Sequence, residues 1–221
     1  MGAMSTTGTK STKSTTPAKA VKAAAAAAPE RVVHDTPVDC PTVAGWERWL
    51  KRHHATAAGV WLRMAKKGSG FPTVAYAEVL EVALCHGWID GQRKSDDAHY
   101  FLQRFTPRTK RSIWSQINRA KALKLIEEGR MQPAGLAEVE RAKADGRWEA
   151  AYEASSTATV PPDLQAALDA NKKAAAFFAK LDARNRFAIL FRTQGAKKPE
   201  TRARRIAQFV EMLAKGEKIH P

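Results

Sequence analysis

Apolar side chains follow two different periods along this chain, and the change between the two constrains the fold more than any other feature. Around residue 60 they alternate with other side chains, so that Val60, Leu62 and Met64 fall on one side of an extended segment, as in a strand with one buried face. From residue 163 to residue 215 they recur every three to four residues, which is the period of helices. The sequence therefore predicts an α+β fold, with a small antiparallel sheet covered by helices and followed by an all-helical C-terminal module.

Turn and capping residues divide these two parts into elements. Gly87 ends one apolar helical stripe and Gly129 ends another, because glycine is favoured just beyond a helix. In the stripe before Gly129 we expect the core to receive Ile113, Ile117, Ala120 and Leu123. The first part is predicted to contain a strand over 60–66, a hairpin of strands 88–94 and 99–106, and helices over 42–54, 76–86, 112–128 and 136–145. The second part is predicted to contain helices over 163–170, 172–181, 183–193 and 200–215.

Composition divides the chain into four segments. Residues 1–36 hold mostly Ser, Thr, Lys, Ala and Pro, and such a segment buries too little apolar surface to offset its ordering entropy. We therefore expect a disordered basic tail, of which residues 1–4 resemble a cloning scar. The polar stretch 155–162 ends in proline and predicts a linker. These boundaries leave an α+β domain over 37–154 and a helical module over 163–221.

The balance of charge is strongly positive. Lys and Arg number 37 against 22 Asp and Glu, which gives a net charge of +15, and the cations concentrate in 104–124 and 192–205. A field of this sign attracts polyanions such as nucleic acid, although basic faces can also be merely solvated. The residues that we expect to contact nucleic acid are Lys110, Arg111, Arg119, Lys121, Lys197, Lys198, Arg202, Arg204 and Arg205. The last three could instead bind an acidic protein partner.

A second set of polar residues follows the predicted hairpin, where the chain passes through a proline turn into a helix. Helix starts favour anions because their first N–H groups have no intrahelical partner. The candidate ligand- or phosphate-binding residues are Asp90, Arg104, Arg108, Ser112, Trp114, Ser115 and Asn118. Two structural alternatives stay open: Ser112 or Thr109 caps the helix, and Asp90 pairs with an arginine of the facing strand.

Other chemically capable residues favour structural roles. Cys85 and His86 are adjacent, but Cys85 closes an apolar helical stripe, which indicates a buried, unreactive thiol. His53 and His54 would point about 100° apart on a helix and would not easily bind one metal ion. The six tryptophans fall inside regular patterns and are expected mostly in the core. With no nucleotide-binding motif present, the sequence predicts no catalytic residue, no metal and no cofactor.

Membrane insertion and secretion are not indicated by the sequence. No apolar run reaches the roughly 18 residues of a spanning helix. The alanine run 23–28 is shorter than the apolar region of a signal peptide. We therefore expect a cytoplasmic protein with no transmembrane segment, and the sequence leaves its oligomeric state open.

Several motifs resemble those of the bacterial YdeI/OmpD-associated (bacteriocin-protection) family. They lie between residues 42 and 215, and the most distinctive are Ala83–Gly91 (ALCHGWIDG), Ser112–Asn118 (SIWSQIN) and Ala196–Ile206 (AKKPETRARRI). The resemblance implies an α+β body related to the YjbR/frataxin-like group, a role in stress protection, and no catalytic residue that can be carried over.

Three functions follow from these observations. The first is a non-enzymatic stress-protection protein that binds a polyanion, most plausibly nucleic acid, through its basic clusters and tail. The second is a protein-interaction adaptor that uses the basic C-terminal helices. The third is a binder of a small anionic ligand, or an enzyme, with a pocket around Asp90, Arg104, Arg108, Trp114 and Ser115.

Overall fold

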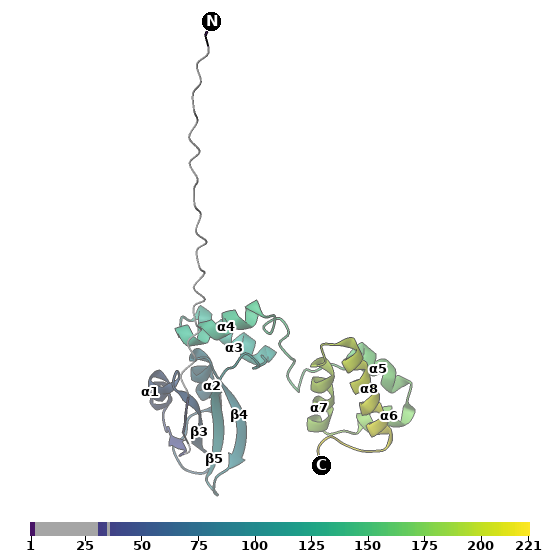
Figure 1. Cartoon of the computed structure of the whole chain (residues 1–221). Helices are drawn as coiled ribbons and strands as arrows, with labels where there is room; N and C mark the ends of the chain where they lie inside the picture. Colours follow the sequence, from purple (N-terminus) through teal and green to yellow (C-terminus); the bar gives the residue numbers. More distant parts are fainter. Residues whose placement is uncertain (3–30, 35) are drawn as a thin grey trace. The chain divides into compact units, whose positions relative to one another are not determined.

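A computed structural model describes residues 1–2, 31–34 and 36–221 of the chain (Figure 1). The predictions of a disordered tail over 1–36 and of a cloning scar over 1–4 fall largely outside the described residues. Within the predicted tail, Val32 and Val33 form a short strand instead, in which Val32 pairs with Ala57. None of the helices in the described part of the chain is long and apolar enough to cross a bilayer.

An antiparallel sheet forms the centre of the first part. Its strands are β3 (Ala57–Ala65), β5 (Tyr100–Pro107) and β4 (Trp88–Ser95), which lie in that order. The two-residue strands β1 (Val32–Val33) and β2 (Val38–Asp39) pair in parallel with β3. Strand β3 begins three residues before the predicted start at residue 60, since β1 supplies hydrogen-bonding partners at this end.

Helices pack on one face of the sheet and complete the core. Figure 1 shows α1 and α2 on the same side of the strands. The helices of this part are α1 (Val43–His53), α2 (Tyr76–Cys85), α3 (Gln116–Glu127) and α4 (Pro133–Ala144). Their apolar residues form one cluster with Val60, Leu62 and Phe105 of the sheet. Trp46, Trp88 and Trp114 are among its largest fully buried side chains, as the regular placement of the tryptophans predicts.

A second apolar cluster occupies the helical module. Its helices are α5 (Pro162–Asp169), α6 (Lys172–Ala179), α7 (Ala183–Gln194) and α8 (Pro199–Ala214). Ile206, Phe209 and Leu213 of α8 are buried in this cluster, as their helical spacing predicts. The α+β fold is confirmed: an antiparallel sheet covered by helices is followed by helices alone.

Helix α3 departs from the prediction in both its start and its buried face. It begins at Gln116 rather than at residue 112, because Trp114 and Gln116 exchange backbone hydrogen bonds with Tyr152, which holds the preceding segment extended. The expected core residues Ile113, Ile117 and Leu123 are each about half exposed, and Ala120 is exposed as well. The buried residues are instead Ala122 and Leu125. The helix carries two apolar stripes, and periodicity alone does not say which one faces the core.

Candidate functional site

A cavity of about 220 Å³ lies where α1, α2 and β5 end and α4 begins. Its lining is polar for a site beside a hydrophobic core, with cationic, imidazole and carboxyl side chains from four parts of the chain. The lining residues are Arg31, His54, Ala55, His86, Gly87, Trp88, Pro107, Arg108, Ala134 and Glu138. Such a small, mostly pre-formed space with a few convergent polar groups is typical of a ligand site.

Gly87 allows the walls of this cavity to come together. It has a φ of +73°, and a Cβ at this position would lie 2.8 Å from the carbonyl oxygen of Ala134. Only glycine combines this backbone conformation with so close an approach of α4. The Gly87 carbonyl in turn accepts a hydrogen bond from the N–H of Arg108 (2.9 Å). The end of α2 therefore fixes both the start of α4 and the residue that follows β5.

Arg108 is the most unusual side chain of the site, because it is charged and only 4% exposed. Its guanidinium carbon lies 3.6 Å from the centre of the Trp114 ring, and its Nη1 donates to the carbonyl oxygen of Ile113 (3.2 Å). Its Nε and Nη2 atoms are buried and have no hydrogen-bond partner among the described residues. Burial lowers the pKa of Arg108 to about 10, so the group is still positively charged at neutral pH.

His86 supplies a third buried polar atom without a partner to the cavity lining. It is 4% exposed, and its Nδ1 finds no hydrogen bond within the described part of the chain. Burial, followed by the neighbouring His54 ring at 5.4 Å, lowers the pKa of His86 to about 4. The imidazole is therefore neutral at pH 7, and its Nδ1 is a donor or an acceptor according to the tautomer.

Glu138 contributes a carboxyl group from α4. Burial raises its pKa, and the nearby guanidinium groups of Arg141 and Arg108 oppose this effect. The carboxylate forms an ion pair with Arg141 one turn away. The cavity thus combines a buried cation with an unpaired edge, a neutral imidazole and a carboxylate that already has a partner.

This arrangement suits binding better than covalent chemistry. The Nε–H and Nη2–H groups of arginine point in parallel from one edge of the guanidinium plane, which matches the two oxygens of a carboxylate or phosphate. Cys85 is not placed to act as a nucleophile here, because it lines a different cavity and burial raises the pKa of its thiol. A low pKa is what a reactive cysteine needs.

Of the seven residues that the sequence suggests for a small-ligand site, Arg108 alone lines the cavity, and Trp114 lies against it. Asp90 accepts a hydrogen bond from the hydroxyl of Tyr76 (2.5 Å) and not from an arginine of the facing strand. Ser115 caps α3 by accepting from the N–H of Asn118. The alternative in which Ser112 or Thr109 caps this helix is therefore wrong. Those two hydroxyl groups bond to each other in the preceding turn.

Arg104, the remaining member of this set, lies away from the cavity. It projects from β5 beside Trp61 of β3, and its guanidinium carbon is 5.6 Å from the Trp61 ring centre. His86, Glu138 and Arg31 also line the cavity, although the sequence did not indicate them as site residues. His86 was the easiest to find, because it stands next to the glycine that ends α2.

The two basic clusters are only partly free to meet a ligand. Arg119 and Arg205 donate to the backbone carbonyls of Trp148 and Arg192. Lys121 pairs with Glu81, and Arg202 forms a two-pronged ion pair with Asp163. The expected nucleic-acid residues that are exposed, with no side-chain partner among the described residues, are Lys110, Arg111, Lys197, Lys198 and Arg204. Arg204 is thus the most accessible of the three arginines suggested for an acidic partner.

Comparison with known families divides the chain in the same way as its apolar clusters. Residues 38–138, which include His86, Arg108 and Glu138, match the model of a domain of unknown function (DUF8412). Residues 157–216 match the model described as "Bacteriocin-protection, YdeI or OmpD-Associated". The resemblance to that family is therefore supported for the helical module, and nothing in the comparisons supports a YjbR/frataxin-like body. Searches of curated proteins and of solved structures found no match.

Proposed function

We propose that this chain binds a small ligand through a carboxylate or phosphate group, which Arg108 holds in the cavity. The observation that carries the proposal is the unpaired Nε/Nη2 edge of a side chain that is 96% buried. A buried cation without a full set of partners costs free energy that a folded protein normally avoids. A bound oxyanion would supply both missing acceptors and a compensating charge.

The cavity limits the ligand to a small molecule. Its volume of about 220 Å³ is below the range of about 300–1,000 Å³ found for drug-sized ligands. The neutral Nδ1 of His86 can form one further hydrogen bond, while the Glu138 carboxylate disfavours a second negative charge nearby. A monoanion with one additional polar group fits these three side chains best.

The test is a binding screen on the full chain with acetate, lactate, benzoate and inorganic phosphate, measured by calorimetry and by the rise in Tm. Arg108→Met is the informative variant, and Arg52→Met is its control, since Arg52 is an exposed arginine of α1 that lies outside the cavity. We expect saturable binding of at least one oxyanion, loss of that binding in Arg108→Met, and no change in Arg52→Met. Binding that survives Arg108→Met would contradict the proposal, as would no binding by any of these anions at millimolar concentration.

A second function, nucleic-acid binding, is favoured by the exposed and unpaired cations Lys110, Arg111, Lys197, Lys198 and Arg204. In a chain of net charge +15 these side chains supply sequence-independent attraction to phosphates. The test is fluorescence anisotropy with labelled DNA at 50 and 200 mM salt. We expect affinity to fall steeply with salt and to fall again when Lys197 and Lys198 are changed to Glu. Stress protection, the role that the family description of residues 157–216 suggests, would then act through this binding.

A further inference from the structure

The outer face of the sheet carries a second concentration of unusual side chains. Trp61 of β3 and Arg104 of β5 alternate with core residues along their strands and point to this face, and the apolar cluster beneath the helices does not include them. Leu102 of β5 lies on the same face but is only 5% exposed. The buried residues of α1 to α4 belong to the core cluster. The accessible part of the outer face is the surface around the half-buried Trp61, which could meet a flat ligand.

Trp61 of β3 lies near two cations, which come from the neighbouring strands β5 and β4. Its ring centre lies 4.5 Å from Nζ of Lys94 and 5.6 Å from Cζ of Arg104. Trp61 and Arg104 are direct partners across the β3–β5 ladder. Trp61 is half-buried, so part of its ring remains accessible. We call Trp61, Lys94 and Arg104 the Trp61 patch.

Glycine at position 59 makes room for the arginine of this patch. A Cβ on Gly59 would lie 2.8 Å from Nη2 of Arg104 and 3.0 Å from the carbonyl oxygen of Phe105. The guanidinium group therefore occupies space beside Trp61 that any other residue at position 59 would fill.

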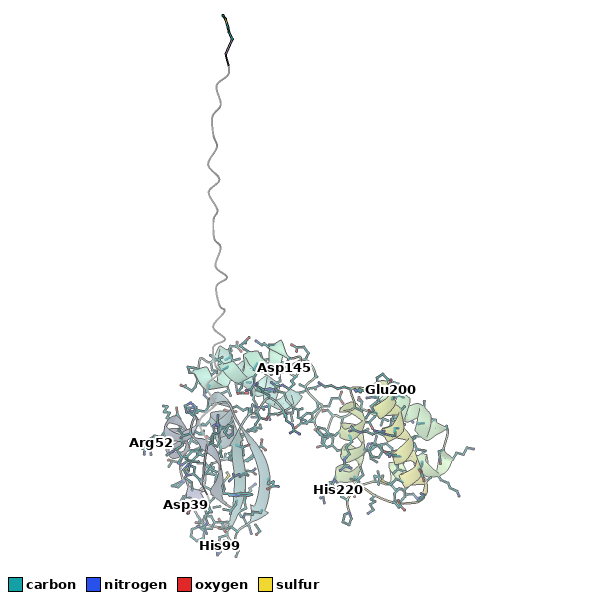
Figure 2. The ribbon with its side chains drawn as sticks, viewed as in Figure 1. Asp39, Arg52, His99, Asp145, Glu200 and His220 are labelled. Atoms are coloured by element: carbon teal, nitrogen blue, oxygen red, sulfur yellow. The ribbon has the colours of Figure 1, made fainter. Side chains whose placement is uncertain are left out.

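Among the described residues, the aspartates that form ion pairs on this face gather around Arg63. Arg63 lies within 4 Å of three aspartates, Asp39 (3.9 Å), Asp96 (2.6 Å) and Asp97 (2.7 Å). Figure 2 shows Asp39 at one end of the sheet near His99, whose backbone N–H donates to the carboxylate of Asp97. Lys94 and Arg104 have no ion pair with any described residue. The Trp61 patch is thus a net cationic surface around an aromatic ring.

We infer that the Trp61 patch binds single-stranded nucleic acid, with a base stacked against Trp61 and flanking phosphates on Lys94 and Arg104. An unpaired base exposes a π-face that tryptophan can stack on, whereas the bases of a duplex are already stacked. Two cations beside one aromatic ring match the alternation of phosphate and base along a single strand. An acidic peptide would satisfy the cations but would gain little from the ring. This inference deepens the second proposed function by giving it a site and a strand preference.

The test compares a labelled 15-nucleotide dT strand with a duplex of the same length, by anisotropy on the full chain at 50 mM salt. We expect the single strand to bind more tightly, and Trp61→Ala to weaken it by about tenfold, since one stacked base contributes about 1–3 kcal/mol. The double variant Lys94→Gln/Arg104→Gln should weaken it further and flatten its salt dependence. Lys172→Gln, an exposed lysine of α6, is the control and should have no effect.

The outcomes separate this inference from the broader proposal. If neither the single strand nor the duplex binds at low salt, the inference about the Trp61 patch and the proposal of nucleic-acid binding both fail. If the single strand binds equally well to the native chain and to a folded Trp61→Ala variant, or if the duplex binds more tightly, the inference fails while nucleic-acid binding stands. Near-UV circular dichroism of each variant shows whether the fold is intact. Displacement of the strand by polyglutamate with no effect of Trp61→Ala would assign the patch to an acidic peptide and overturn the inference.

Discussion

The guanidinium plane of Arg108 stacks on the indole of Trp114, with 3.6 Å between the arginine Cζ and the ring centre. Both side chains are almost fully buried, at 4% and 2% exposure. The ring stabilises the positive charge from one face without using any N–H group. Because Nη1 is bonded to Ile113, the arginine is held in place while its other edge is left unpaired. The proposed binding of an oxyanion requires such a pre-organised edge.

Replacing Arg108 separates a ligand-binding role from a structural one. Arg108→Met keeps most of the volume beside Trp114 and removes a buried charge whose partners are incomplete. We therefore expect the free energy of unfolding either to rise or to fall by no more than about 1 kcal/mol. Oxyanion binding should be lost in the same variant. Urea unfolding and calorimetry measure the two effects independently.

Arg108→Lys is the second half of this test. It preserves the charge but removes the planar pair of N–H groups, so we expect oxyanion affinity to fall at least tenfold. A structural arginine gives the opposite pattern: Arg108→Met would then destabilise the fold by about 3 kcal/mol or more, because the partners of a buried pair would be left unsatisfied.

The lowered pKa of His86 makes the stability of the fold depend on pH. Its pKa of about 4 in the folded chain lies below the ordinary value of 6.5, so the unfolded chain binds more protons between these two pH values. Stability from the neutral imidazole is therefore fully present above pH 6.5 and is lost as pH falls towards 4. The shift corresponds to about 3 kcal/mol.

The measurement is the free energy of unfolding in urea at pH 7, 6 and 5. We expect His86→Gln to lose less stability than the native chain over this range, whatever its stability at pH 7. Glu138 acts in the opposite sense, since its raised pKa favours the folded chain as pH falls, but it is present in both proteins and cancels in the comparison. His99→Gln, at the exposed end of the hairpin, serves as control and should keep the native pH profile.

Much of the fold follows from local pattern. The hairpin β4–β5 and the helix that ends at Gly87 lie within one or two residues of their predicted bounds, since alternation and a glycine stop are local signals. The face of α3 was predicted wrongly because Ile117 and Leu123 have the same helical spacing as a core stripe. The start of the helix also depends on a distant residue, because Tyr152, 38 positions after Trp114, forms backbone hydrogen bonds with the segment before the helix.

The residues of the candidate site were harder to predict from the sequence than the fold. Arg108 and Trp114 are six positions apart and were recognised together, whereas Glu138 and Arg31 reach the cavity only through the packing of α4 and of the segment before β1. The charge density along the chain also overestimates how many cations are free to bind a ligand, because Arg202 and Lys121 are paired with carboxylates distant in sequence. Ion pairs of this kind have no local signature.

Two helix-terminating glycines offer a matched test of the close contact at the cavity wall. Gly87 and Gly146 have nearly the same φ, +73° and +75°, but a Cβ on Gly146 would meet nothing within 4 Å, whereas one on Gly87 would meet the carbonyl of Ala134. We expect Gly146→Ala to cost about 1 kcal/mol of unfolding free energy from backbone strain alone. Gly87→Ala should cost about 2 kcal/mol more, through overpacking against α4, and should also weaken oxyanion binding. Equal costs in chemical unfolding would show that the contact with α4 is unimportant.

Arg202 and Arg204 are close neighbours on α8, but the side chain of Arg202 is paired and that of Arg204 is free among the described residues. Arg202 forms a bidentate pair with Asp163 of α5 (2.5 and 2.8 Å) and donates to the carbonyl of Thr193 (3.0 Å), whereas Arg204 is exposed and has no side-chain partner in the described part of the chain. Arg202→Ala should therefore destabilise the chain by about 1 kcal/mol, since partly exposed pairs contribute little more, and Arg204→Ala should leave its Tm unchanged.

In nucleic-acid binding the order of the two variants reverses. Arg204→Ala should lower the affinity and reduce its salt dependence, because only a free cation releases counterions from the phosphates. Arg202→Ala should bind as the native chain does. A scan of Tm together with anisotropy at two salt concentrations tests both halves, and equal behaviour of the two variants in either assay would contradict the division between structural and ligand-binding cations.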